Sequence, residues 1–196
     1  MSNPLLIGVT GGIGSGKSLV CKIFSLLGAS VYYADDRAKW ISNHDPIVRE
    51  KIIREFGREA YSIEGLNREY LAQTVFSDNK KLEVLNAIVH PAVGNDFQDW
   101  VKEQHTPYIL KEAALMFESG SYKMLDKVVT VTAPAEVRIR RVLQRDPHRT
   151  RIEVEGIIQK QLSEEERIRR ADYVLYNDES KLVIPQVLAL HEEFSR

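Results

Sequence analysis

Short apolar runs alternate with longer amphipathic stretches along this chain of 196 residues. Continuous apolar or β-branched runs of four to six residues are typical of strands buried on both faces, whereas apolar residues three or four positions apart are typical of helices. The pattern predicts strands at residues 5–10, 29–34, 108–112, 127–132 and 173–176. Because helical patterns separate these runs, we expect an α/β fold with a parallel five-stranded sheet that helices cover on both faces.

The interval between the second and third predicted strands departs from this alternation. Residues 35–106 contain about four helical stretches and no convincing strand. The clearest helical stretches are 46–56, 68–76 and 80–102. We expect His90-Pro91 to break or bend the longest of them. A sheet crossover needs far fewer residues, so the pattern predicts an all-helical insertion at about 44–104, which would cover the ligand-binding edge of the sheet as a substrate cap.

The segment between the first strand and the next helix carries the clearest chemical signal. It reads Gly11-Gly12-Ile13-Gly14-Ser15-Gly16-Lys17-Ser18 and fits G-x-x-x-x-G-K-[ST], the phosphate-binding P-loop. Glycines let backbone N–H groups turn towards an anion, and the helix dipole adds to the attraction. We expect Lys17 to reach the β- and γ-phosphates and Ser18 to bind Mg²⁺. The alternative is a glycine-rich turn that binds nothing, against which the strand–loop–helix context argues.

Carboxylates follow two of the predicted strands at the edge where ligands bind. Asp35 and Asp36 come directly after the second strand, where a carboxylate can accept the proton of an acceptor hydroxyl. We expect Asp35 to be the general base and Asp36 to cap the following helix, although position alone leaves both roles open for Asp35. Glu112, at the end of the third strand, and Glu118 are alternatives for holding a Mg²⁺-bound water.

Arginines are concentrated between residues 138 and 151, where Asp146 is the only acidic residue. Arg138, Arg141 and Arg145 share one helix face by their spacing. Beside a P-loop, such cations are expected to clamp the transferred phosphate. The alternative is a solvated basic face that complements the helix dipole.

Composition excludes several classes of function. The formal net charge of −1 argues against an electrostatic nucleic-acid binder. Cys21 is the only cysteine, which excludes an internal disulfide and a cysteine-cluster metal site. No apolar run approaches the roughly 18 residues of a membrane span, and no signal-peptide pattern opens the chain. We therefore expect a cytoplasmic protein that contacts neither membrane nor nucleic acid.

Several segments together resemble the dephospho-coenzyme A kinase family. The opening signature of the family is similar to residues 8–18, and its Ala-Asp element is similar to Ala34-Asp35. Further similarities occur at Arg68, Leu71, Val75-Phe76, Leu85-Asn86, His90-Pro91, Arg141, Arg145-Asp146, Gln161, Arg167, Ala171-Asp172 and Asn177. The resemblance therefore covers essentially the whole chain.

This resemblance implies a P-loop NTPase-type three-layer core at 1–43 and 105–196, with a helical lid at about 146–170 and a substrate-binding insertion at 44–104. It implies transfer of the γ-phosphoryl group of ATP to the ribose 3′-hydroxyl of dephospho-CoA with Mg²⁺, the last step of coenzyme A synthesis. The implied catalytic residues are Asp35 as base, Lys17, Arg141 and Arg145. The implied ATP-binding residues are Gly12, Ile13, Gly14, Ser15, Gly16, Lys17, Ser18 and, near the adenine, Asn177. The implied substrate-binding residues are Asp35, Lys39, Arg68, His90 and Glu118, and the implied metal-binding residues are Ser18 and, through water, Glu112.

Four positions depart from the family pattern. Tyr33 and Glu112 each replace an aspartate, Ala114 replaces a proline, and Lys39 replaces an arginine. Lys39 keeps the positive charge but loses bidentate phosphate geometry. Glu112 is one methylene longer than the usual acid.

Three other functions fit parts of the sequence. Another small-molecule P-loop kinase, of the nucleoside monophosphate or gluconate type, would share the loop. A nucleotide-switched module would need Asn-Lys-x-Asp for guanine, and the nearest string, Asn79-Lys80-Lys81-Leu82, fails at its last position. A nucleic-acid binder could use the arginine-rich stretch, but that stretch lacks interleaved aromatic residues.

Overall fold

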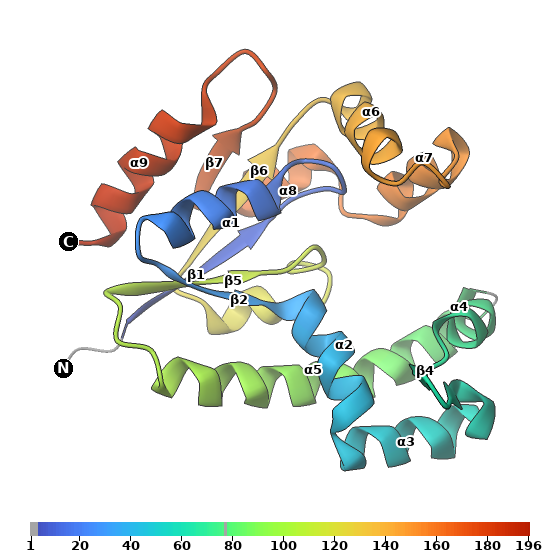
Figure 1. Ribbon diagram of the computed structural model, residues 1–196. Helices are drawn as coiled ribbons and strands as arrows, with labels where there is room; N and C mark the ends of the chain where they lie inside the picture. Colours follow the sequence, from blue (N-terminus) through green and yellow to red (C-terminus); the bar gives the residue numbers. More distant parts are fainter. Residues whose placement is uncertain (1–3, 77) are drawn as a thin grey trace. The chain divides into compact units, whose positions relative to one another are not determined.

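The computed structural model describes residues 4–76 and 78–196, and the chain divides into two compact units (Figure 1). The helical unit is Ala34–Glu103, and the sheet unit is the rest of the described chain. The helical unit begins before the predicted start at residue 44 because helix α2, Ala34–His44, packs against other helices of that unit.

The sheet unit is built on five parallel strands, which confirms the predicted α/β class. Their order is β2-β5-β1-β6-β7, so the first strand lies at the centre. The strands are β1 Leu5–Thr10, β2 Ser30–Tyr33, β5 Tyr108–Glu112, β6 Lys127–Thr132 and β7 Tyr173–Tyr176. In the ladder Val9 lies opposite Glu112, and Thr10 lies opposite Thr130, so these strands end at one edge of the sheet.

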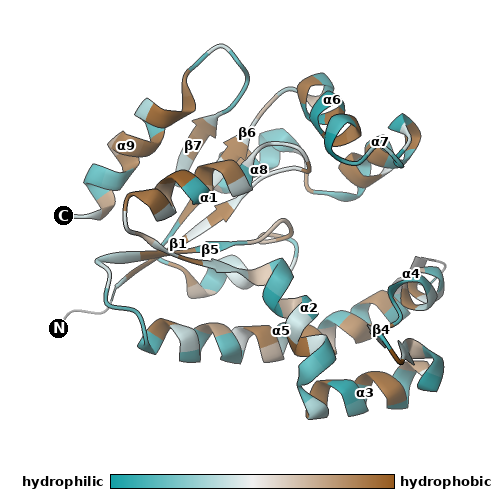
Figure 2. Cartoon of the chain, viewed as in Figure 1, coloured by the Kyte–Doolittle hydropathy of each residue, from teal (hydrophilic) through white to brown (hydrophobic). Residues whose placement is uncertain are grey.

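One face of the sheet packs against helices α1, Lys17–Leu26, and α9, Val183–Phe194. Alternate strand residues point into this layer, as the period of two in a strand requires. The buried members are Ile7, Val9, Val20, Cys21, Phe24, Ala29, Tyr108, Leu110, Val129, Val131, Leu175, Val187 and Phe194. Figure 2 shows hydrophobic colouring along β6, β7 and α9. This core fixes α1, and therefore the loop before it, against the centre of the sheet.

The other face of the sheet carries the segment that follows β5. Met116 is fully buried, and a Cβ added to Gly8 would lie 2.4 Å from its Sδ atom. The same Cβ would lie 2.7 Å from Leu125 Cδ1. Glycine at position 8 therefore lets this segment approach the central strand.

The sheet unit is completed by helices between β5 and β7. They are η2 Ser121–Met124, α6 Ala135–Arg145, α7 Arg151–Lys160 and α8 Glu164–Arg170. Helix α7 begins with a capping box between Thr150 and Glu153, and α8 is capped by Ser163. Helix α8 packs against β6, which brings the segment before it to the edge of the sheet where the P-loop lies.

The helical unit contains α2, α3 Pro46–Phe56, η1 Arg58–Ala60, α4 Arg68–Phe76 and α5 Asn79–Lys102. It also contains a hairpin of β3, Tyr61–Ser62, and β4, Gly65–Leu66, so the prediction of an all-helical insertion is wrong at this point. These two-residue strands are too short to give an alternating pattern. They are fixed by side chains of α2 and its neighbours: Asn43 Oδ1 accepts from Leu66 N–H at 2.7 Å, and Tyr61 donates to the Ser42 carbonyl at 2.6 Å.

Helix α5 runs through Pro91 without interruption, so of the predicted break or bend at this proline the break is wrong. Proline removes one N–H donor and crowds the preceding turn, at a typical cost of about 3 kcal/mol. Contacts of α5 with α2, α3 and α4 supply the tertiary packing that keeps the helix continuous.

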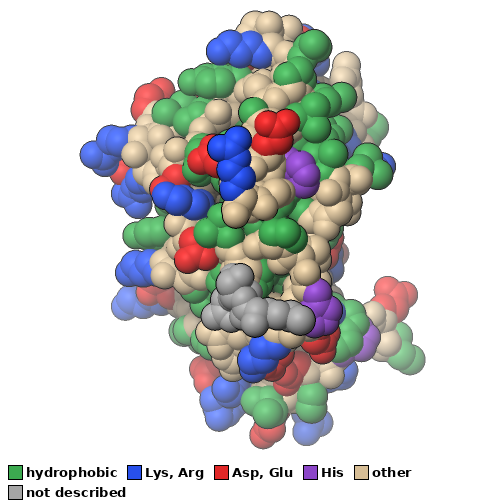
Figure 3. All heavy atoms as spheres, turned by 90° about the vertical axis from the view of Figure 1, so that its left-hand side faces the viewer, with side chains coloured by type: hydrophobic (Ala, Val, Ile, Leu, Met, Phe, Trp, Pro, Cys, Tyr) green, Lys and Arg blue, Asp and Glu red, His purple; other side chains and the backbone are tan. Residues whose placement is uncertain are grey.

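Basic and acidic side chains are intermixed over the face shown in Figure 3. Among the described helices, none combines the length and the apolar character that a membrane span requires.

Candidate active site

The loop that joins β1 to α1 has a backbone that strongly favours glycine at two key positions. Gly14 has a φ of +77° and Gly16 a φ of +97°. A Cβ would lie 2.5 Å from the Arg138 carbonyl oxygen at Gly14 and 2.2 Å from Asn177 Nδ2 at Gly16. The loop therefore adopts the tight curl expected of a P-loop, and two distant segments of the chain pack directly onto it.

Lys17 lies over this loop at the start of α1. Its side chain is buried, and Nζ donates to the carbonyls of Gly11 at 3.0 Å and Gly12 at 3.3 Å. No side chain caps the helix at Gly16, so the first N–H groups of α1 are not satisfied by a side-chain cap. These donors, the helix dipole and the lysine charge together favour an anion here.

Three buried polar atoms around the loop have no hydrogen-bond partner among the described residues. They are Thr10 Oγ1, Ser15 Oγ and Arg138 Nη1, and one further such atom, Arg149 Nε, lies outside the loop. Buried polar groups in folded proteins are normally satisfied by protein or by ordered water. Their concentration at the P-loop is the arrangement expected of a site that a polar ligand completes.

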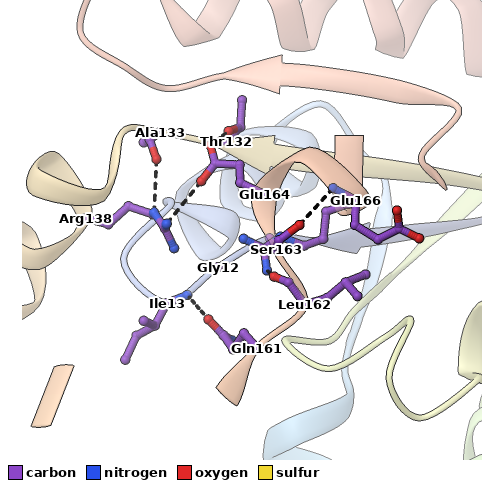
Figure 4. A network of polar contacts seen from close by, with 12 residues as sticks. Gly12, Ile13, Thr132, Ala133, Arg138, Gln161, Leu162, Ser163, Glu164 and Glu166 are labelled. Atoms are coloured by element: carbon purple, nitrogen blue, oxygen red, sulfur yellow. Dashed lines mark hydrogen bonds and ion pairs between the residues drawn. The ribbon is translucent and has the colours of Figure 1, made fainter. Parts of the chain in front are cut away.

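The segment between α7 and α8 contacts the loop directly. The Ile13 N–H donates to Gln161 Oε1 at 2.9 Å (Figure 4). Backbone N–H groups of a P-loop are the donors that hold phosphate. An anion bound at this position would therefore replace the amide oxygen of Gln161.

Two buried arginines meet at Gly12. Arg138 in α6 and Arg167 in α8 each have only 4% of their surface exposed. Arg138 donates from Nε to the Ala133 carbonyl at 3.0 Å and forms an ion pair with Glu164 at 3.1 Å (Figure 4). Glu164 also accepts a hydrogen bond from Thr132. The guanidinium groups therefore lie at the phosphate loop and are not part of a solvated face.

Asn177, the residue after β7, braces the loop from the other side. Its Nδ2 donates to the Ser15 carbonyl at 2.8 Å, and its own carbonyl accepts from Arg141 Nη1 at 2.9 Å. Arg141 also forms an ion pair with Glu179. The structure thus brings Asn177 against the predicted phosphate loop and attaches Arg141 to it.

Arg145 has a different environment from the other two arginines of its predicted helix face. Its side chain is 65% exposed and makes a bidentate contact with Asp146, at 3.1 and 2.8 Å. The hydrogen bond from Arg145 holds the pKa of Asp146 below its usual value. In this structure Arg138 is buried, Arg141 is half-buried and Arg145 is exposed, so the three side chains are not equivalent.

The two glutamates considered for a Mg²⁺-bound water lie in distinct surroundings. Glu112 is buried at the end of β5, where both it and Lys17 interact electrostatically with the thiol of Cys21. Glu118 Oε1 instead accepts from Leu162 N–H at 2.8 Å and so anchors the segment that carries Gln161.

Magnesium fits the donor set at the loop. Ser18 is exposed in the first turn of α1, and Glu112 lies at the end of the strand next to β1. Hydroxyl and carboxylate oxygens are suitable ligands for Mg²⁺, which usually keeps several waters and binds substrate phosphates. In the described part of the chain, no three His, Cys, Asp or Glu side chains cluster as an all-protein metal cage.

The remaining predicted residues belong to the helical unit. Asp35 is exposed, two residues after the end of β2 and inside the first turn of α2. Asp36 lies in the same turn and pairs with Lys39 at 2.7 Å, so its predicted role as a helix cap is wrong. Helix α2 begins earlier than the sequence suggested, because Ala34 is already helical. Arg68 is exposed at the start of α4.

His90 lies on α5, directly before Pro91, and is exposed. Pro91 lines a cavity of about 480 Å³ within the helical unit. Trp40 and Ile88 form part of its apolar wall, and Asp96, which pairs with Arg37, contributes an acidic group.

Comparison with known proteins identifies the family. The family model described as dephospho-CoA kinase matches residues 5–182. This chain belongs to the dephospho-CoA kinase family. A dephospho-CoA kinase of Porphyromonas gingivalis is 38% identical over 192 residues, which cover 96% of this chain and 93% of that protein.

Solved structures place the fold in the same family. The crystal structure of TT1252 from Thermus thermophilus has a TM-score of 0.87 at 35% identity, and the match covers 98% of both chains. The dephospho-CoA kinase from Campylobacter jejuni has a TM-score of 0.69 at 26% identity, covering 97% of this chain and 96% of that one. As a member of this kinase family, the chain is a phosphotransferase with an alcohol acceptor and uses ATP as a substrate.

Sequence reasoning did not find the contacts of Gly12. The sequence predicts Arg138 only as one of three arginines that share a helix face, and Arg167 only as part of a family pattern. One signal was available: Arg138 lies four residues before the apolar Val142, which places it on the buried side of α6. Glu164 gave no comparable signal, because its contacts depend on the packing of α8.

Proposed function

We propose that this dephospho-CoA kinase family member transfers the γ-phosphoryl group of ATP to the ribose 3′-hydroxyl of dephospho-CoA, giving coenzyme A and ADP. The observation that carries the proposal is the P-loop itself. Lys17 lies over this loop, and three buried polar atoms around it have no hydrogen-bond partner among the described residues. The family supplies the identity of the acceptor.

In the proposed reaction, the loop N–H groups and Lys17 hold the phosphates of ATP. Ser18 and, through water, Glu112 would hold Mg²⁺, which neutralises charge on the β- and γ-phosphates when bound. Arg141 and Arg145 would neutralise charge on the transferring group. Gly12 to Ser18 would make the other contacts with the nucleotide, together with Asn177.

The acceptor side of the reaction is assigned to the residues after β2 and in the helical unit. Asp35 takes the proton of the 3′-hydroxyl as the new O–P bond forms. The bond between the γ-phosphorus and the bridging oxygen then breaks, and ADP leaves with its electron pair. Lys39, Arg68, His90 and Glu118 would bind dephospho-CoA.

The segment at 146–170 is assigned the role of a lid. It contacts the loop through Gln161 and the segment after β5 through Glu118. When such a lid closes, it excludes the water that would otherwise compete as the phosphoryl acceptor.

The first test is the reaction itself. Purified protein is incubated with Mg-ATP and dephospho-CoA, and CoA and ADP are measured by mass spectrometry. We expect equal amounts of both products. ADP without CoA would overturn the proposed acceptor, and a panel of nucleoside monophosphates and gluconate would then identify another.

Lys17→Ala provides the control for this test. Because Lys17 supplies a positive charge at the P-loop, we expect turnover of Lys17→Ala to fall by at least about 100-fold, as when one preorganised charge-stabilising group is removed. Circular dichroism should show the same secondary structure as the unsubstituted protein. Full activity in a folded Lys17→Ala protein would contradict the assignment of the P-loop as the phosphate site.

A further inference from the structure

Arg138 presents an unused donor to the P-loop. Its Nε and Nη2 atoms are engaged by the Ala133 carbonyl and the Glu164 carboxylate. Its Nη1 atom is buried and has no hydrogen-bond partner among the described residues. A Cβ added to Gly12 would lie only 2.1 Å from Nη1, so this donor faces the phosphate loop at close range.

Arg167 approaches the same glycine from α8. A Cβ on Gly12 would lie 3.0 Å from its Nη2 atom, while Nη1 donates to the Leu162 carbonyl. Burial, and then the charge of Arg138, hold the pKa of Arg167 below its usual value. Two buried cations thus repel one another at one point of the loop.

Three carboxylates lie near this pair of arginines. Glu164 contacts Arg138, and Glu164, Glu118 and Glu165 interact electrostatically with Arg167. Glu118 is already committed to the Leu162 N–H group. Burial raises the pKa of Glu164, which shows that this carboxylate is itself poorly solvated.

We propose that Arg138 and Arg167 form a guanidinium pair that binds a phosphate group of the nucleotide at Gly12, and that Glu164 is the internal counterion which this phosphate displaces. The inference rests on ATP binding at the P-loop but not on the identity of the acceptor. Arginine suits this role because its planar fork can bind two phosphate oxygens at once. Because Gly12 has no side chain, both guanidinium groups can approach the loop at this position.

A purely structural ion pair and a displaced counterion differ in one measurable respect. If Glu164 only supports the fold, Glu164→Gln weakens ATP binding or leaves it unchanged. If Glu164 competes with phosphate, the same substitution strengthens binding, because Gln keeps an acceptor for Thr132 and loses the negative charge. The sign of the change therefore decides between the two roles.

The test is calorimetric titration of the protein with Mg-ATP in the absence of dephospho-CoA. We expect Arg138→Gln and Arg167→Gln each to weaken binding by about 10- to 100-fold, the usual effect of losing a charged hydrogen bond. Glu164→Gln should tighten binding by at least about threefold. Arg140→Gln is the matched control on the same helix, because Arg140 is half exposed and pairs with Glu179, and binding should stay within about twofold.

Unchanged binding in Arg138→Gln, or weaker or unchanged binding in Glu164→Gln, would overturn the proposal. Arg138→Gln leaves Glu164 buried without its ion-pair partner. The double substitution Arg138→Gln/Glu164→Gln removes both charges, so it tests the loss of Arg138 a second time, with folding checked by thermal denaturation. It should bind ATP more weakly than the unsubstituted protein, because one guanidinium of the pair is lost. Wild-type protein that binds ATP but makes no CoA would overturn the proposed function and leave this inference standing, whereas wild-type protein that binds no ATP would overturn both.

Discussion

Lys17 and Asp35 have opposite tasks in the proposed reaction, and their surroundings differ accordingly. Lys17 is buried and held by two loop carbonyls, so its charge is fixed in place before substrate arrives. Asp35 is exposed in the first turn of α2, where an acceptor hydroxyl can reach it. The distinction between a fixed cation and an accessible base leads to different expectations for their variants.

Asp35→Asn should separate chemistry from nucleotide binding. We expect kcat to fall at least about 100-fold, within the usual range for a lost general base, while the Kd for ATP stays close to that of the unsubstituted protein. Steady-state kinetics and ATP titration measure the two quantities. Asp36→Asn is the neighbouring control in the same turn, and near-normal turnover in Asp35→Asn would refute the role of Asp35.

Cys21 provides a residue-scale test of the core under the P-loop. Burial, and then the negative charge of Glu112, raise the pKa of its thiol. Since the thiolate is the reactive form, we expect the native protein to resist alkylation by iodoacetamide at pH 8. Protein unfolded in guanidinium should react fully, and mass spectrometry counts the single adduct. Rapid labelling of the native protein would show that α1 opens.

At the scale of elements, buried strands and well-capped helices could be predicted, while features set by tertiary contacts could not. Residues 5–10 and 127–132 are strands with the expected bounds, because their β-branched runs have no competing helical period. Helix α3 also has the expected bounds, since Asp45 caps it and Gly57 ends it. The β3–β4 hairpin and the continuity of α5 through Pro91 depend on packing within the helical unit.

The same limit applies to the candidate site. The P-loop could be predicted because its signal is local: a strand, glycines, a lysine and a helix follow one another. The pairing of Arg138 with Glu164 could not, because it requires α6 and α8 to meet beside β6, and no short-range pattern encodes that meeting. Sequence thus identifies the phosphate-binding backbone better than the side chains that surround it.

Alanine substitution at two glycines should change the stability of the protein in opposite directions. Gly156 lies inside α7, and a Cβ there would meet nothing within 4 Å, so Gly156→Ala should stabilise the protein by about 0.5–1 kcal/mol through helix propensity. Gly16→Ala should destabilise it, because φ is +97° and the new Cβ would lie 2.2 Å from Asn177 Nδ2. Urea unfolding measures both changes. A stabilising effect of Gly16→Ala would contradict the described loop.

The stability of the whole molecule should depend on Lys111. This lysine is only 3% exposed, and its Nζ donates to Met124 Sδ at 3.4 Å. Burial lowers its pKa from 10.5 to about 8. Between these pH values the unfolded chain binds more protons than the folded chain, so this group makes the free energy of unfolding rise with pH.

Lys111→Met tests this dependence. We expect the variant to be more stable than the unsubstituted protein at pH 7, because a buried charge is replaced by an apolar side chain of similar length. The difference between the two proteins should shrink from about pH 8 to pH 10.5, as measured by urea unfolding. A constant difference across this range would contradict a lowered pKa for Lys111.

The contact of Asn177 with Ser15 has a consequence for the synthesis of the protein. These residues lie 162 positions apart, yet one hydrogen bond joins them across the nucleotide loop. The loop leaves the ribosome before Asn177 does, so it acquires this brace only after β7 has emerged and paired with β6. A nascent chain therefore carries the whole P-loop sequence well before the loop is braced, and we expect ATP to stabilise only chains whose synthesis has passed β7.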